Sequence, residues 1–199
     1  MSSGIAPECW AGAVLVAALV LVGGQAKAGE VWVGAYSHDF TGDQEGGYDI
    51  QVGARTSRLD ALKWLGRPAV DVQLAFNNET STDYAAVGLD WKLRLFGKFY
   101  ARPGFGLAYT TGKAVLPPAN APNLSPEELE RRLHLKAVRI DFGSHVLFKP
   151  EMAVGYEFSD RLALEASYVH LSNGQIFHQG KNQGLDDAGA RLVWRFGAR

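Results

Sequence analysis

A histidine and a serine lie two positions apart near the C-terminus, and an aspartate follows after a short polar segment. The chain reads Tyr-Val-His-Leu-Ser-Asn-Gly over residues 168–174 and Asn-Gln-Gly-Leu-Asp over residues 182–186. A serine nucleophile, a histidine base and a carboxylate that orients the histidine are the parts of an acyl-transfer site. We therefore predict an ester hydrolase with Ser172 as nucleophile, His170 as base and Asp186 as orienting acid.

The tetrahedral intermediate of such a reaction needs hydrogen-bond donors for its oxyanion. Asn173, Gly174 and Asn182 adjoin the proposed nucleophile and acid in the sequence. Side-chain amides and exposed backbone N–H groups supply such donors, so we assign these three residues to the oxyanion site or its support.

The segments that must position these residues alternate between apolar and polar side chains with a period of two, which predicts β-strands. Eight strands are expected, at residues 30–40, 47–57, 68–77, 82–95, 98–111, 143–158, 161–173 and 185–197. Tight turns at 96–98 and 159–160 alternate with longer segments at 41–47, 78–82, 112–142 and 174–184, although 57–67 is a longer exception. Short turns at one end and long loops at the other predict an eight-stranded antiparallel transmembrane β-barrel.

Counting along the last two strands indicates the face on which the candidate residues lie. In the strand 161–173 the apolar face leads directly to His170 and Ser172; its members are Leu162, Leu164, Ala166 and Tyr168. In the last strand the apolar face leads back to Asp186; its members are Phe196, Trp194, Leu192, Ala190 and Ala188. The three residues should therefore meet on the lipid-facing side near the long loops, with Asp187 on the opposite face. Two alternatives stay open: strand ends that turn polar at the headgroups, and a soluble β-sandwich or lipocalin-like barrel with the apolar face inside.

The composition and the N-terminus indicate an exported protein. The 199 residues carry a formal net charge of −1, which gives no signal for nucleic acid binding. An apolar run at 11–23 and the Ala-Lys-Ala of 26–28 predict a signal peptide over 1–28, followed by the barrel domain at 29–199. An uncleaved N-terminal anchor is the alternative. Cys9, the only cysteine, lies in the predicted signal, so the mature chain has neither a disulfide nor a cysteine-bound metal.

A short helix is expected in the longest loop. Ser125 has the form of a helix cap, with proline next and Glu128 three positions on, and the helix should run to about Leu133. It carries Arg131 and Arg132, which are either solvated or in contact with lipid phosphates, since arginine binds phosphate bidentately.

The remaining polar groups give weaker signals. His38, Asp39 and Asp43 form a minor metal-site candidate at the first long loop. Asn78-Glu-Thr80 matches a glycosylation motif that is common by chance, and no nucleotide-binding motif is found.

The order His170-Leu-Ser172-Asn173, then Asn182 and Asp186 four positions later, resembles the lipid A 3-O-deacylase (PagL) family. The resemblance implies an outer-membrane barrel over the whole mature chain, with His170 as base, Ser172 as nucleophile and Asn182 at the oxyanion hole. It also implies Asp186 as the acid, where the family usually has glutamate, and Phe148 as an aromatic residue near the site.

The resemblance implies hydrolysis of the ester of the 3-hydroxyacyl chain at the 3 position of lipid A, with neither a metal nor an organic cofactor. The expected partners are lipopolysaccharide and the bacterial outer membrane, with a homodimer left open. Two rival functions are a non-enzymatic small barrel and a phospholipase or acyltransferase that acts on another lipid.

Overall fold

The alternating segments form antiparallel strands in the computed structural model, which describes residues 28–42, 44–79 and 81–197. The strands are β1 Ala28–Ser37, β2 Tyr48–Thr56, β3 Ala69–Asn77, β4 Tyr84–Asp90, β5 Leu93–Arg94, β6 Phe99–Thr110, β7 Val146–Glu157, β8 Leu162–Leu171 and β9 Leu185–Gly197. The expected signal peptide lies outside the described residues except for Ala28, the first residue of β1, so its cleavage stays a prediction.

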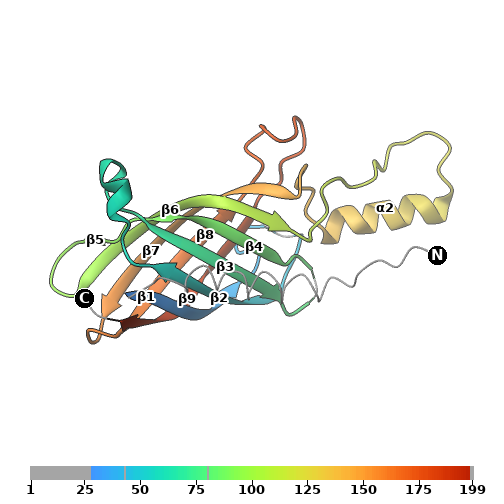
Figure 1. The fold of residues 1–199 in the computed structure, drawn as a ribbon. Coiled ribbons are helices and arrows are strands. Elements are labelled where there is room, and N and C mark those ends of the chain that lie inside the picture. Colours follow the sequence, from blue (N-terminus) through green and yellow to red (C-terminus); the bar gives the residue numbers. More distant parts are fainter. Residues whose placement is uncertain (1–27, 43, 80, 198–199) are drawn as a thin grey trace, which may run out of the picture.

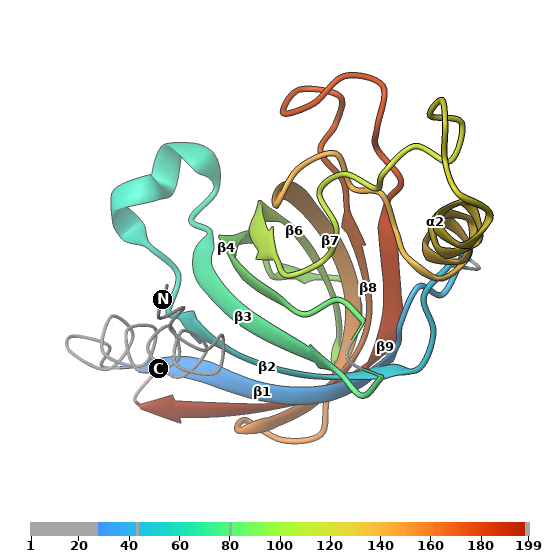
Figure 2. The ribbon, with the colours of Figure 1, turned by 90° about the vertical axis from the view of Figure 1, so that its right-hand side faces the viewer.

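The sheet closes on itself as a barrel. Strands that are neighbours in sequence pair with each other, except that β4 pairs with β6 and not with β5, and β1 pairs with β9 (Figure 2). The two-residue β5 also pairs with β6 and lies, like β4, within the single strand predicted at 82–95. Among the described residues the barrel therefore has eight spanning strands, as predicted, and one of them is interrupted at residues 91–92.

Short turns and long loops lie at opposite ends of the barrel (Figure 1). The turns after β5 and β7 lie at one end, together with the 3-10 helix η1, Asp60–Leu65, within the longer connection that was noted as an exception. The loop with helix α2, Pro126–Val138, and the loop 174–184 lie at the other end, which we call the long-loop end.

Helix α2 begins as predicted, because the Ser125 side chain accepts a hydrogen bond from the backbone N–H of Glu128. It continues beyond the expected Leu133 because the next residues include neither glycine nor proline, and it ends where Arg139 is extended. In the described part of the chain, no helix combines the length and the apolar character needed to cross a membrane.

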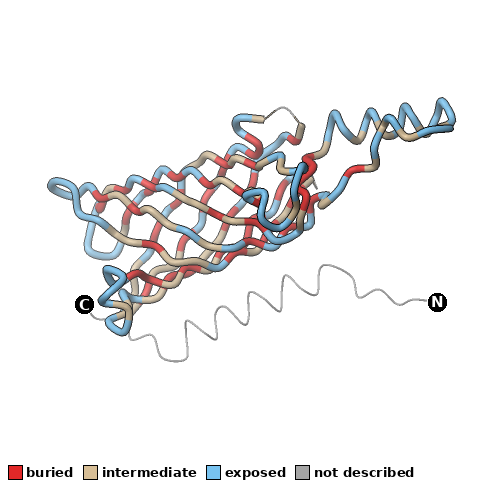
Figure 3. The backbone as a smooth tube through the Cα atoms, turned by 90° about the horizontal axis from the view of Figure 1, so that it is seen from above, coloured by how far each residue is buried: buried red, intermediate tan, exposed pale blue. Residues whose placement is uncertain are grey.

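The burial of the strands shows which face points inward (Figure 3). Burial alternates along the strands, and much of the inward set is polar: it includes Gln51, Arg55, Asp71, Gln73, Arg102, Glu165 and Arg191, beside aromatic and small residues such as Trp32, Tyr36 and Ala75. Large apolar side chains are exposed on the outside, among them Val33, Ile50, Val87, Phe105, Met152, Leu164, Leu192 and Trp194. This is the arrangement of a membrane barrel, so the soluble alternatives are wrong.

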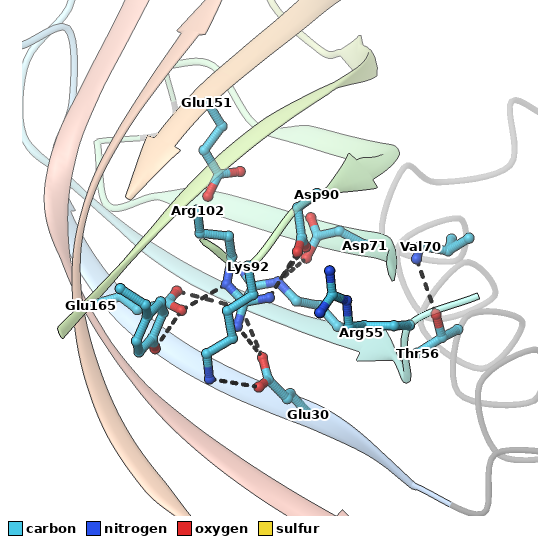
Figure 4. A network of polar contacts seen from close by, with 12 residues as sticks. Glu30, Arg55, Thr56, Val70, Asp71, Asp90, Lys92, Arg102, Glu151 and Glu165 are labelled. Atoms are coloured by element: carbon cyan, nitrogen blue, oxygen red, sulfur yellow. Dashed lines mark hydrogen bonds and ion pairs between the residues drawn. The ribbon is translucent and has the colours of Figure 1, made fainter. Parts of the chain in front are cut away.

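Ion pairs fill the interior between the strands (Figure 4). Arg102 pairs with Glu165 at 2.9 Å, with Asp90 at 2.7 Å and with Glu30 at 2.6 Å. Arg55 is also buried and lies 2.8 Å from Asp90 and 3.4 Å from Glu165. Removing one partner would leave a buried charge uncompensated, which is strongly destabilising.

Candidate active site

The last two strands bring His170 and Asp186 face to face on the outside of the barrel. They are directly opposite in the pairing of β8 with β9, and Nδ1 of His170 lies 2.6 Å from Oδ1 of Asp186. The His170 side chain is 36% exposed and that of Asp186 is 16% exposed, whereas Asp187 is buried on the inner face. Because Nδ1 faces the carboxylate, Nε2 is the ring nitrogen left to accept a proton.

Two further hydroxyl groups hold the Asp186 carboxylate. Tyr168 donates to Oδ1 at 2.6 Å, and Thr41 donates to Oδ2. The backbone N–H of Phe40 also donates to the Asp186 carbonyl oxygen at 2.6 Å, which joins the first long loop to β9. Sequence reasoning missed both hydroxyls. The outward row that contains Tyr168 was a usable signal, but nothing in the sequence singles out Thr41.

Gly184 makes room for the His170 imidazole because it has no side chain. A Cβ built on Gly184 would lie 2.6 Å from Cε1 and 3.4 Å from Nε2 of His170. Real Cβ contacts are longer than this, so a glycine at this position lets the ring pack against the backbone of the loop end.

Ser172 continues the outward row beyond the end of β8. It forms a β-bridge with Phe148 of β7, in which each backbone N–H donates to the other carbonyl, at 3.1 Å and 2.7 Å. Among the described residues no hydrogen bond joins the Ser172 hydroxyl to His170. Such hydrogen bonds are often long in free enzymes and shorten when substrate binds.

The loop after Ser172 is tied down by Asn173, which is fully buried. Its amide nitrogen donates to the carbonyl oxygens of Phe142 at 2.6 Å and Lys181 at 2.5 Å, and its amide oxygen accepts from the Gln175 N–H at 2.7 Å. This side chain is fully engaged, so it supports the loop and does not point a donor at a substrate.

The other two predicted support residues lie beside it. Asn182 accepts the backbone N–H of Asn173 through Oδ1 at 2.7 Å, so its amide nitrogen is the group that can serve as a donor. Gly174 is exposed and has a φ of +62°, a conformation that favours glycine.

An aromatic stack borders the serine. The Phe148 ring stacks on Phe177 with centroids 4.9 Å apart and on Phe105 with centroids 5.8 Å apart. Since Phe148 is the bridge partner of Ser172, the stack places apolar surface directly beside the hydroxyl.

The structure does not bring the two helix arginines into this group. Arg131 and Arg132 both pair with Glu128, at 2.7 Å and 2.6 Å, and Arg132 also donates to the carbonyl oxygen of Pro118. Helix α2 projects away from the end of the barrel (Figure 1). These contacts favour the solvated interpretation, and lipid contact stays an untested prediction.

The minor metal-site candidate at the first long loop is only partly assembled. His38 is buried, but Asp39 accepts the backbone N–H groups of Gln44 and Glu45 and is not directed at the His38 ring. Asp43 lies outside the described residues.

Comparisons with known proteins identify the family and the fold. The family model described as lipid A 3-O-deacylase (PagL) matches residues 43–195. The crystal structure of the outer membrane enzyme PagL superposes with a TM-score of 0.53 at 12% identity, covering 84% of this chain and 98% of that one. Neisserial surface protein A gives a TM-score of 0.52 at 13% identity, covering 86% of this chain and 98% of that one. No curated protein sequence matches the chain.

Proposed function

Because this chain belongs to the lipid A 3-O-deacylase (PagL) family, we propose that Ser172, His170 and Asp186 form its catalytic triad. Family membership makes the chain a lipid A deacylase of the bacterial outer membrane. The finer proposal is that the triad cleaves the ester of the 3-hydroxyacyl chain at the 3 position. Neither the family match nor the described residues support the homodimer that was left open.

One observation carries the proposal: an ionisable pair joined at 2.6 Å lies on the face that meets lipid. A charged side chain on the lipid face costs about 2–4 kcal/mol for a basic residue at midplane and less near the interface. Catalysis on a membrane lipid gives such a pair a reason to be there.

In the first half of the reaction, the Ser172 hydroxyl attacks the acyl carbonyl carbon as Nε2 of His170 removes its proton. Asp186 holds Nδ1–H and stabilises the imidazolium that forms. Gly174 N–H and the Asn182 amide nitrogen are the proposed donors to the oxyanion. The ester C–O bond then breaks, the sugar 3-oxygen takes the proton from His170, and the acyl chain stays on Ser172.

In the second half, a water molecule gives a proton to His170 and attacks the acyl-serine carbonyl. Collapse of this intermediate releases a 3-hydroxy fatty acid and restores the serine. This step needs water at the serine and an apolar surface for the acyl chain. The long-loop end offers both, because water reaches the loops while the acyl chain remains beside the stacked ring of Phe148.

Mass spectrometry of lipid A from cells that express the chain tests the proposal. The wild type should remove one 3-hydroxyacyl group, and Ser172→Ala should remove none. Ser37→Ala is the matched control, since Ser37 is an exposed residue at the same end of the neighbouring β1. Unchanged lipid A with a folded wild-type barrel would refute deacylation, and fatty acid released from phospholipids alone would favour the phospholipase alternative.

A further inference from the structure

A second cluster of chemically active groups lies inside the barrel, behind the proposed catalytic pair. His38 follows β1, Asp49 belongs to β2 and Asp187 belongs to β9, and these three strands are adjacent in the sheet. Nδ1 of His38 lies 3.0 Å from Oδ2 of Asp49 and 3.6 Å from Oδ1 of Asp187. One ligand atom from each residue falls within 4.8 Å of the others, and all three side chains are buried.

His38 and Asp49 each make a further polar contact with a residue outside this group of three. Nε2 of His38 lies 3.2 Å from a carboxylate oxygen of Glu45, and Asn77 donates to Oδ1 of Asp49 at 3.0 Å. Metal-bound histidines usually donate their other ring N–H to a carboxylate in this way, and metal-bound carboxylates are themselves hydrogen-bonded.

Asp187 provides a second observation in favour of a bound cation. Its Oδ2 accepts hydrogen bonds from Gln51 at 2.9 Å and from Tyr84 at 3.0 Å. Its Oδ1 is buried without a hydrogen-bond partner among the described residues and faces Nδ1 of His38. A buried carboxylate oxygen is costly to leave without a partner, so this atom is available as a ligand for a cation.

We propose that His38, Asp49 and Asp187 bind a divalent first-row transition cation, with Zn²⁺ as the representative. One imidazole nitrogen and two carboxylate oxygens suit Zn²⁺ or Mn²⁺, whereas Ca²⁺ takes six to eight oxygen ligands. The acidic character of the cluster also suits a cation. Asp49, Asp187 and Glu45 bring three carboxylates close to His38, and Arg139 lies 3.8 Å from Glu45.

The cation would act as a structural staple at the long-loop end. It would join the ends of three adjacent strands, directly below the loop in which Thr41 reaches Asp186. Asp186 and Asp187 are consecutive residues that point to opposite faces of β9. Fixing Asp187 inside therefore also restrains the strand that presents Asp186 outside.

Titration of the refolded, chelator-treated full chain in detergent with Zn²⁺, Mn²⁺, Ca²⁺ or Mg²⁺ tests this. We expect about one equivalent of Zn²⁺ to bind and to raise the midpoint of thermal unfolding, with Ca²⁺ and Mg²⁺ binding at least tenfold more weakly. Asp187→Asn and His38→Gln should each weaken Zn²⁺ binding by at least tenfold. Asp186→Asn is the matched control for binding, because it removes a neighbouring carboxylate from the other face.

The wild type alone decides the matter if a variant does not fold. Co²⁺ should give the visible absorption of a low-coordinate site with nitrogen and oxygen ligands, a signal that Zn²⁺ then displaces. Absence of stoichiometric binding by the folded wild type would overturn the proposal. Equal binding by folded Asp187→Asn would overturn it as well. Deacylase activity is not part of either readout, so the two proposals fail separately.

Discussion

Replacing Gly184 with alanine tests how closely the imidazole of His170 must be held. The new methyl group would lie 2.6 Å from Cε1 of His170 and 3.2 Å from the carbonyl oxygen of Leu171. Carbon atoms pack best at roughly 3.5–4.0 Å, and the carbonyl belongs to the strand backbone, so the ring is the group that moves, by about 1 Å. The displaced Nε2 is the proposed proton acceptor, and a misplacement of about 1 Å can lower a rate on the order of 100-fold.

The assay is the release of 3-hydroxy fatty acid from purified lipid A in detergent micelles, with kcat and KM measured separately. We expect kcat to fall by roughly 10- to 100-fold, with a smaller change in KM, because the lipid contacts are untouched. Gly46→Ala is the control, since a Cβ there meets only Glu79, at 3.9 Å. A folded Gly184→Ala protein that keeps the wild-type kcat would refute the claim that this close packing positions the base.

Three further substitutions test the acid of the site and the ion-pair network of the barrel interior. Tyr168→Phe removes a hydrogen-bond donor to the Asp186 carboxylate. Because a hydrogen bond to a charged group contributes about 1.5–3 kcal/mol, kcat should fall roughly tenfold with KM unchanged. Tyr109→Phe, on the same outer face, is the control and should change neither kcat nor KM. Asp186→Glu adds a methylene to an acid that already lies 2.6 Å from His170. We therefore expect kcat to fall, although the family resemblance implies glutamate at this position. A higher kcat would show that the aspartate is too short. Glu165→Gln leaves buried Arg102 and Arg191 undercompensated, so the free energy of unfolding in urea should fall by about 3–5 kcal/mol; an unchanged value would contradict a stabilising role of the network.

The strands and their inner and outer faces were predictable because they follow from local alternation. The same alternation placed His170 and Asp186 on the outer face, and the register of β8 with β9 sets them directly opposite. Sequential strands pair in a barrel, so a count along two neighbouring segments was enough.

The contacts that were missed depend on register across several strands. Thr41 reaches Asp186 across 145 positions of sequence, and the His38 cluster draws on the ends of β1, β2 and β9. The sequence pointed to Asp39 as a companion of His38. The companions in the structure are Asp49 and Asp187, which only the closed barrel brings together. The interruption after β4 was missed as well, because the alternation continues through it.

The alternation of β9 connects the two faces of the long-loop end. Asp186 and Asp187 are consecutive residues of β9, and their side chains point toward lipid and into the barrel, respectively. Each lies against a residue of the segment that follows β1. Thr41 contacts the first and His38 contacts the second, so this segment contacts both faces of the sheet. The barrel wall is a single sheet, so no second layer of protein supports a site on its outer face. The groups inside the barrel must supply that support. The rigidity of the proposed lipid-facing triad is therefore expected to depend on charged groups inside the barrel.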